Sequence, residues 1–153
     1  MVTVKELLTQ AAVQDRLSDS LETGYNTNEL VAYLNDAVNF IWHVLVARQY
    51  YEVIGDITLT EKETAIPDDW YKATNQAPVI AREGKLECYG KLPYVVRYYK
   101  KVPLIAGEDS EIPLNNWGLL DLATQIMVVL AMSNHGFDMQ MESDFAQAIV
   151  KLI

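Results

Sequence analysis

The chain has 153 residues, of which 50% are hydrophobic and 22% are charged. This balance is typical of a globular domain and excludes a disordered chain, and the single cysteine excludes an intrachain disulfide. The formal net charge of −9 argues against a DNA-binding domain, because affinity for duplex DNA depends on cations that neutralise phosphates. Two readings of the charge stay open: it keeps the protein soluble, or it forms a wall that repels a duplex sliding past.

We expect neither a signal peptide nor a membrane span. Lys5 and Glu6 precede any long apolar run. The longest apolar stretch, Trp117–Met132, is interrupted by polar residues and is too short to cross a bilayer. The lone Cys88 suits a reducing compartment. We therefore expect a soluble protein that is made in a cytoplasm.

Two helices are expected at the start of the chain. The first spans residues 4–17, with Thr3 and Glu6 as a capping-box pair at its beginning. Residues 18–25 form a polar loop, which we expect to be mobile in the isolated subunit. The second helix spans residues 27–49, because apolar residues recur at the helical period over four turns.

The middle of the chain has the pattern of β-strands. Strands are predicted at residues 57–60, 63–66, 78–82, 85–89 and 94–100. The first two are expected to form a hairpin that turns at Glu61 and Lys62. Gly84 and Gly90 mark the later turns, and Pro103 ends the last strand because it has no amide hydrogen to donate.

Two further helices are expected after the strands. The third spans residues 117–134, is capped by Asn115 or Asn116, and is apolar nearly all round, as expected of a central helix that is covered on most faces. The fourth runs from Met139 to the end of the sequence. Its expected buried stripe consists of Phe145, Ala148, Ile149 and Leu152.

This order of elements predicts an α+β fold. We expect a mainly helical protein of four helices, α-α-[β insert]-α-α, with a small antiparallel sheet inserted between the second and third helices. Residues 1–153 would form a single domain, with a helical core at residues 1–50 and 115–153 and a β-rich insert at residues 51–104.

The residue types that usually perform catalysis are scarce and isolated. Neither His43 nor His135 has a partner at metal-ligand spacing, and Cys88, in a predicted strand, is expected to be a small core residue. Nucleotide-binding and hydrolase motifs do not occur in the sequence. We expect no catalytic residue, no metal and no cofactor, and hence no enzyme.

Two carboxylates inside the predicted helices have more than one reading. A buried Asp121 with a raised pKa would be a candidate general acid. With Gly118 and Gln125 it instead forms a thin polar stripe on one side of the helix, which favours exposure or a subunit contact. Asp36, flanked by Asn35 and Asn39, is interpreted in the same way.

Tyrosines are concentrated around the predicted strands. Seven of the nine lie in or beside this region: Tyr50, Tyr51, Tyr71, Tyr89, Tyr94, Tyr98 and Tyr99. Adjacent Tyr98 and Tyr99 place a ring on each face of the sheet, so a small sheet covered on one face would leave several rings exposed. Because tyrosine is enriched in protein interfaces, we expect Tyr89, Tyr94, Tyr98 and Tyr99 to contact other subunits or partners. Ordinary amphipathic packing is the alternative.

Several segments, taken in order, are typical of one protein family. They are residues 33–37 (YLNDA), 66–70 (IPDDW), 94–100 (YVVRYYK), 102–104 (VPL), 108–109 (ED), 112–113 (IP) and the apolar helix from Trp117. In this set, which spans about residues 26–135, the chain resembles the head-to-tail adaptor (connector) proteins of tailed bacteriophages.

The resemblance implies a non-catalytic structural subunit. Identical copies would form a ring, twelve-fold in this family, that docks under the portal protein, extends the DNA channel and presents a surface to the next tail protein. Duplex DNA would pass through without sequence-specific binding, and no membrane is involved. The protein would be made in the cytoplasm of a bacterial host and lie at the head–tail interface of the virion. A ring requires heterologous contacts, in which each subunit uses two different faces.

Adaptors of this kind carry a polar C-terminal arm that reaches the portal, whereas this sequence keeps an apolar helical pattern up to Ile153. Either docking uses other segments, or the printed sequence is part of a longer chain. Other classes of function are a small regulatory or ligand-binding α+β module, an enzyme built around Asp121 or Asp36, and another virion part such as a tail-completion protein. The ligand-binding module would need a concave pocket lined with aromatic side chains and a few convergent polar groups.

Overall fold

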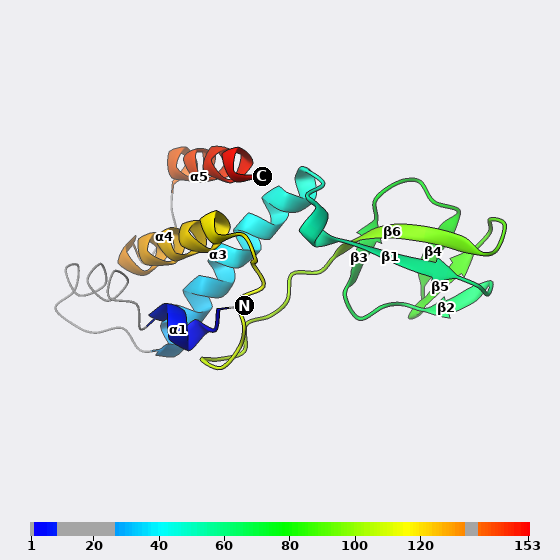
Figure 1. The fold of residues 1–153 in the computed structure, drawn as a ribbon, viewed down its shortest axis with the longest axis horizontal. Helices are drawn as coiled ribbons and strands as arrows, with labels where there is room; N and C mark the ends of the chain where they lie inside the picture. Colours follow the sequence, from blue (N-terminus) through cyan, green and yellow to red (C-terminus); the bar gives the residue numbers. More distant parts are fainter. Residues whose placement is uncertain (1, 9–26, 134–137) are drawn as a thin grey trace. The chain divides into compact units, whose positions relative to one another are not determined.

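The computed structural model describes residues 2–8, 27–133 and 138–153 of the chain (Figure 1). The predicted helix beyond Leu8, the predicted mobile loop at residues 18–25 and His135 therefore lie outside the described residues. Contacts along the chain divide it into two compact units. We call Met1–Leu45 with Pro103–Ile153 the helical unit, and Val46–Val102 the β unit. The β unit nearly coincides with the predicted insert at residues 51–104, and the prediction of one single domain stays a prediction.

The helical unit contains α1 (Val4–Leu8), α3 (Thr27–Ala47, whose last two residues belong to the β unit), α4 (Trp117–Ser133) and α5 (Met139–Leu152). At the beginning of α1 the backbone amide of Glu6 donates to Thr3 Oγ1 at 3.2 Å, which is one half of the predicted capping box. The amides of Val4 and Lys5 donate to the carbonyl oxygens of Ser110 and Glu108, at 3.0 and 2.9 Å. These bonds attach α1 to the segment that precedes α4.

Helix α3 has the buried apolar face that its sequence pattern predicts. Leu34, Ala37, Ile41 and Leu45 are fully buried. By length and composition alone, residues 28–47 could cross a membrane, since their mean hydropathy is 1.4, and 44% of the stretch is buried inside the protein. A core helix of a soluble protein meets the same criteria. Burial of one continuous face against its own chain favours the core-helix reading.

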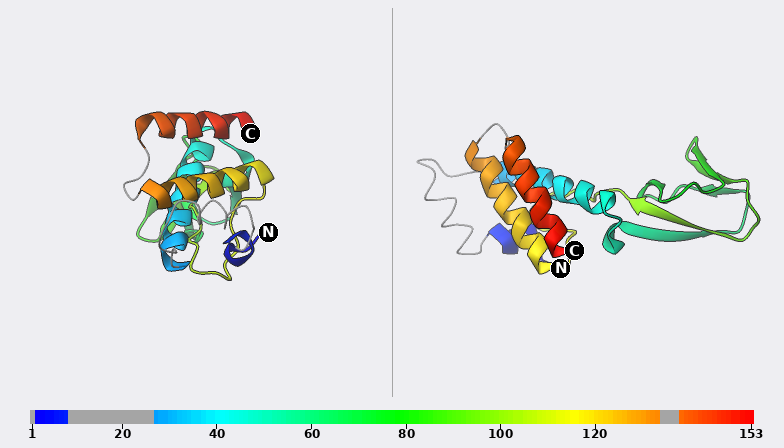
Figure 2. Two further views of the ribbon diagram at one scale, coloured as in Figure 1. Left: turned by 90° about the vertical axis from the view of Figure 1, so that its left-hand side faces the viewer. Right: turned by 90° about the horizontal axis from the view of Figure 1, so that it is seen from above.

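Helices α4 and α5 are antiparallel neighbours (Figure 2). Helix α4 is covered on most faces, as predicted, and Asn116 is its cap: Asn116 Oδ1 accepts the amides of Gly118 and Leu119 at 2.9 and 3.2 Å. In α5, Asp138 caps the beginning by accepting the amide of Met141 at 2.9 Å.

The predicted buried stripe of α5 is only partly correct. Of its four residues, Ile149 is fully buried, Phe145 and Ala148 are half-buried, and Leu152 is 40% exposed. The contact with α4 is therefore narrower than the apolar stripe of α5, and its last turn presents apolar surface to solvent.

The β unit consists of two three-stranded antiparallel sheets. One has the order β1 (Ile54–Leu59), β6 (Tyr94–Lys100), β3 (Trp70–Ala73), and the other the order β2 (Glu63–Ala65), β5 (Lys85–Cys88), β4 (Val79–Arg82). Both sheets contribute to one core: Leu59, Trp70, Val96 and Tyr98 from the first, Leu86 and Cys88 from the second. On β6, the core-facing Val96 and Tyr98 alternate with the exposed Val95 and Arg97, as a strand with one buried face requires.

The α+β class is confirmed, but the prediction of one small sheet is wrong, because the insert contains two. The predicted hairpin of residues 57–60 and 63–66 is also wrong: β1 pairs with β6, and β2 pairs with β5. The chain passes from one sheet to the other at residues 60–62, so that both sheets cover the shared core. Strand β3 escaped prediction because it is short and its register shifts between Trp70 and Lys72, which breaks the alternation on which a strand prediction depends.

The turn predicted at Gly84 is present between β4 and β5. Arg82 pairs with Lys85, which leaves a two-residue loop. Both loop residues have a positive φ, 53° at Glu83 and 77° at Gly84. This is the combination that a type I′ turn requires, and the glycine adopts it without steric cost.

Candidate functional site

The side chains that could suggest catalysis lie on different elements of the fold. Within residues 2–8, 27–133 and 138–153, no group of three His, Cys, Asp or Glu side chains could hold a metal ion. Cys88 is a buried free thiol in the core of the β unit, and His43 is exposed on α3. Asp121 is exposed and accepts a hydrogen bond from Gln125 Nε2 at 3.0 Å, so the reading of Asp121 as a buried general acid is wrong.

The four tyrosines expected in subunit contacts have different surroundings. Tyr89 is 56% exposed and Tyr94 is half-buried against the core of the β unit. Tyr98 and Tyr99 are each only 6% exposed, so the expectation that both adjacent rings form an open contact surface is wrong. The alternation was correct, since the two rings face opposite sides of the sheet, but Tyr98 is covered by the shared core of the two sheets.

Tyr98 instead organises the interior of the β unit. Its ring stacks on Trp70 with a centroid distance of 5.0 Å, and its hydroxyl donates to Asp69 Oδ1 at 2.7 Å. Across the sheet it pairs with Gly55, where a Cβ atom would lie 2.9 Å from Tyr98 Cζ. Burial, and then the hydrogen bond to Asp69, raise the pKa of Tyr98 to about 12. Gly55 leaves the space that this ring occupies.

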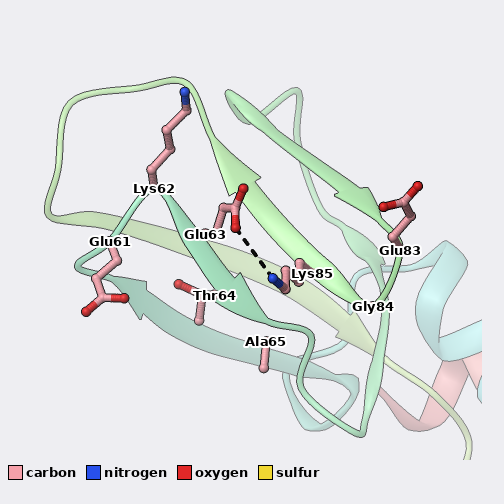
Figure 3. A pocket seen from close by; sticks show the side chains of 8 residues that line it. All are labelled: Glu61, Lys62, Glu63, Thr64, Ala65, Glu83, Gly84 and Lys85. Carbon is pink, nitrogen blue, oxygen red and sulfur yellow. Dashed lines mark ion pairs between the residues drawn. The ribbon is translucent and has the colours of Figure 1, made fainter.

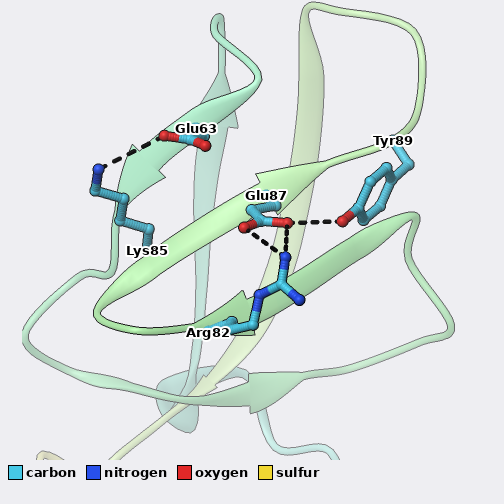
Figure 4. A network of polar contacts seen from close by, with 5 residues as sticks. All are labelled: Glu63, Arg82, Lys85, Glu87 and Tyr89. Atoms are coloured by element: carbon cyan, nitrogen blue, oxygen red, sulfur yellow. Dashed lines mark hydrogen bonds and ion pairs between the residues drawn. The ribbon is translucent and has the colours of Figure 1, made fainter.

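Tyr89 belongs to a polar network on the outer face of the second sheet (Figure 4). Its hydroxyl donates to Glu87 Oε2 at 2.6 Å, and Arg82 Nη2 donates to both oxygens of Glu87 at 3.0 and 2.9 Å. These hydrogen bonds, that of Tyr89 first, lower the pKa of the Glu87 carboxyl. Lys85 pairs with Glu63 at 3.5 Å on the neighbouring strand. These contacts link exposed side chains across strands β4 and β5 and, through the separate pair of Lys85 and Glu63, across β5 and β2.

A groove of about 530 Å³ lies along β2 and the turn between β4 and β5 (Figure 3). It is lined by Glu61, Lys62, Glu63, Thr64, Ala65, Glu83, Gly84 and Lys85. The volume would admit a small molecule, but the lining contains no aromatic side chain, and most of its members are charged and exposed. Ligand pockets are lined mainly by hydrophobic and aromatic side chains and enclose most of the ligand, so this groove does not favour the ligand-binding alternative.

The polar residues singled out on α3 divide into two kinds. Asp36 and Asn39 are exposed. Asn35 is half-buried and holds the backbone of Ile105: its Nδ2 donates to the Ile105 oxygen at 2.8 Å, and its Oδ1 accepts the Ile105 amide at 2.9 Å. Since Ile105 is only 2% exposed, these two bonds satisfy backbone groups that have little access to water.

Large apolar side chains are exposed in both units. In the helical unit they include Leu104, Trp117, Met132, Met139, Leu152 and Ile153, and in the β unit Tyr51, Tyr71, Ile80, Tyr89 and Val95. Trp117, at 76%, and Leu104, at 82%, are among the most exposed. Single exposed apolar residues are common on folded proteins, so they favour a contact surface only where several of them lie together. The sequence predicted tyrosines at such surfaces. It did not predict the exposure of Trp117, because the helix that begins there is apolar nearly all round.

Comparison with protein-family models, with curated proteins and with solved structures finds no match to this chain.

Proposed function

We propose that this chain is a structural subunit of the head-to-tail adaptor of a tailed bacteriophage. In this role it has no catalytic activity. Copies dock as a ring under the portal protein, extend the DNA channel and offer a surface to the next tail protein. Its place in the virion is the head–tail interface.

One observation carries the proposal: segments of the resemblance that are distant in sequence depend on each other in the fold. Asn35, in the YLNDA segment, binds the backbone of Ile105, directly after the VPL segment. Trp70 and Asp69, which end the IPDDW segment, stack on and hydrogen-bond to Tyr98 of the YVVRYYK segment. Residues that contact each other in this way are expected to occur together, so the ordered set is more specific than any one of its short motifs.

Two further features support a role in contact rather than chemistry. The exposed carboxylates Asp36 and Asp121 and the exposed Tyr89 are available for contact with other subunits. Large apolar side chains such as Trp117 are open to solvent. The net charge of −9 fits a channel component that DNA passes without sequence-specific binding.

The test is imaging of the purified chain mixed with the portal protein encoded in the same genome, with each protein alone as a control. We expect a ring of density on the tail-facing end of the portal, with the symmetry of the ring read from class averages. The mass of the complex, measured in solution, gives the number of subunits independently. A chain that stays monomeric and has no affinity for the portal would contradict the proposal.

A further inference from the structure

The net charge of −9 is divided very unequally between the two units. The helical unit contains 13 acidic and 3 basic residues, a net charge of −10. The β unit contains 8 acidic and 9 basic residues, a net charge of +1. Three quarters of all basic side chains therefore lie in little more than a third of the chain.

This division restricts how two copies can meet. Contact between the helical units of two copies would bring two charges of −10 together, and such repulsion opposes association most strongly at low salt. Contact between the helical unit of one copy and the β unit of the next avoids that repulsion. It also uses two different surfaces of the same chain, which is the heterologous arrangement from which closed rings are built.

The β unit has one sheet face suited to such a contact. On the outer face of the β1-β6-β3 sheet, Val95 is 61% exposed, and Arg97 forms an exposed ion pair with Asp56 at 3.1 Å. Lys72, opposite Tyr99 in the register, holds its Nζ 5.6 Å from the ring centroid of Tyr71 and 5.8 Å from that of Tyr99. Tyrosine and arginine are enriched in protein interfaces, and Tyr71, which is 51% exposed, adds apolar area next to the cation of Lys72.

The helical unit has a surface of complementary character at the beginning of α4. Trp117 and Asp121 are both exposed and lie one turn apart, so they share a face of the helix. The end of α5 lies beside them: Leu152 Cδ2 would be 2.7 Å from a Cβ atom at Gly118, and the Leu152 side chain is partly exposed. The surface thus combines apolar area with a carboxylate, where the sheet face combines apolar area with a cation.

We propose that the partner of the outer face of the β1-β6-β3 sheet is a second copy of this chain, which presents its Trp117–Asp121 surface. Lys72 of one copy faces Asp121 of the next, and Tyr71 covers Trp117. The statement that this contact closes the ring rests on the proposed adaptor function. As a self-contact between two copies it can be measured without the portal.

The test compares four proteins: wild type, Lys72→Glu, Asp121→Lys and the variant with both changes. Self-association is measured by sedimentation at about 50 mM and about 500 mM salt, and ring occupancy on the portal is measured in parallel. Each single reversal is expected to weaken association about fivefold at low salt, and the double variant to recover most of the loss, because it restores opposite charges. The Lys62→Glu and Asp109→Lys variants carry the same charge changes on exposed positions elsewhere and should stay within about twofold of wild type. Far-UV circular dichroism checks that every variant is folded.

The outcomes distinguish failure of the self-contact from failure of the adaptor function. The inference would be overturned if the single variants associate as strongly as wild type, or if the double variant associates no more strongly than the single variants. If a ring still forms on the portal in that case, the adaptor function stands. Salt-sensitive association that follows the four-protein pattern, without any binding to portal, would support the self-contact and contradict the adaptor function. Wild type that never self-associates, free or with portal, would overturn both.

Discussion

Gly55 is the position where a single added methyl group should disturb the β unit most specifically. A Cβ atom there would lie 2.9 Å from Cζ and 3.0 Å from Oη of Tyr98. The ring has little freedom to withdraw, because it stacks on Trp70 and its hydroxyl is bound to Asp69 at 2.7 Å. Overpacking of this kind costs about 1–3 kcal/mol. Loss of glycine flexibility in the unfolded chain returns about 0.4–1 kcal/mol, so Gly55→Ala should lower the free energy of unfolding by about 1–2 kcal/mol.

The steric cause is separated from other effects by a double-mutant cycle with Tyr98→Leu. Without the ring, Gly55→Ala should be neutral or slightly stabilising, which gives a coupling of about 1–2 kcal/mol between the two positions. Urea unfolding followed by tryptophan fluorescence and circular dichroism measures all four proteins. Gly107→Ala is the control, since no atom lies within 4 Å of its added Cβ. A Gly55→Ala protein as stable as wild type, or a coupling near zero, would refute the packing argument.

Three further changes test the hydrogen bonds described above. Because the folded state raises the pKa of Tyr98 to about 12, it keeps a proton that the unfolded state releases near pH 10, so the contribution of Tyr98 to stability should fall as the pH rises from about 10 to 12. The Tyr98→Phe variant loses the hydrogen bond to Asp69. Its absorbance titration should lack the tyrosine that is deprotonated at the highest pH. Asn35→Ala should lower the free energy of unfolding by about 2–3 kcal/mol, since it leaves both backbone groups of the buried Ile105 without their partner. Asn116→Ala should cost about 1 kcal/mol through loss of the α4 cap, measured by urea unfolding.

Neighbouring asparagines provide matched controls for the last two changes. Asn39 is exposed one turn beyond Asn35 on α3, and Asn115 is exposed directly before the cap. Asn39→Ala and Asn115→Ala should each change stability by less than about 0.5 kcal/mol. If either control lowers the free energy of unfolding as much as the variant that it matches, the loss of stability comes from helix propensity or local charge. It then does not come from the hydrogen bonds with Ile105 or with the first turn of α4.

Elements whose signal is local could be predicted from the sequence, and those that depend on distant residues could not. Helix α3 and strand β6 follow directly from their apolar periodicity. The pairing of β1 was mistaken, because the spacing around Glu61 and Lys62 resembles a hairpin turn. Pairing was instead decided by Leu59 and Leu86, which come from different sheets and are both fully buried in one core. No local pattern records that contact.

The candidate contact residues show the same division. Alternation correctly placed Tyr98 and Tyr99 on opposite faces, but which face is covered depends on the second sheet, which was not predicted. Asp121 was correctly interpreted as exposed from Gly118 and Gln125, which lie one turn before and one turn after it on the same side of the helix. Asn35 had a signal that was not used: a hydrogen-bonding side chain next to the fully buried Leu34 indicates a polar partner that has to be supplied by the fold.

The two interpretations of the acidic charge, solubility and a wall that repels DNA, apply differently to the two units. A wall that repels passing DNA needs an excess of negative charge on the surface that faces the duplex, and the helical unit, at −10, has that excess. The β unit, at +1, has none, so a ring that lined its channel with β units would neither repel nor strongly attract DNA. If the chain is an adaptor, a channel wall that repels DNA therefore requires helical units that face the duplex. A ring with β units there would leave solubility and subunit contact as the role of the charge.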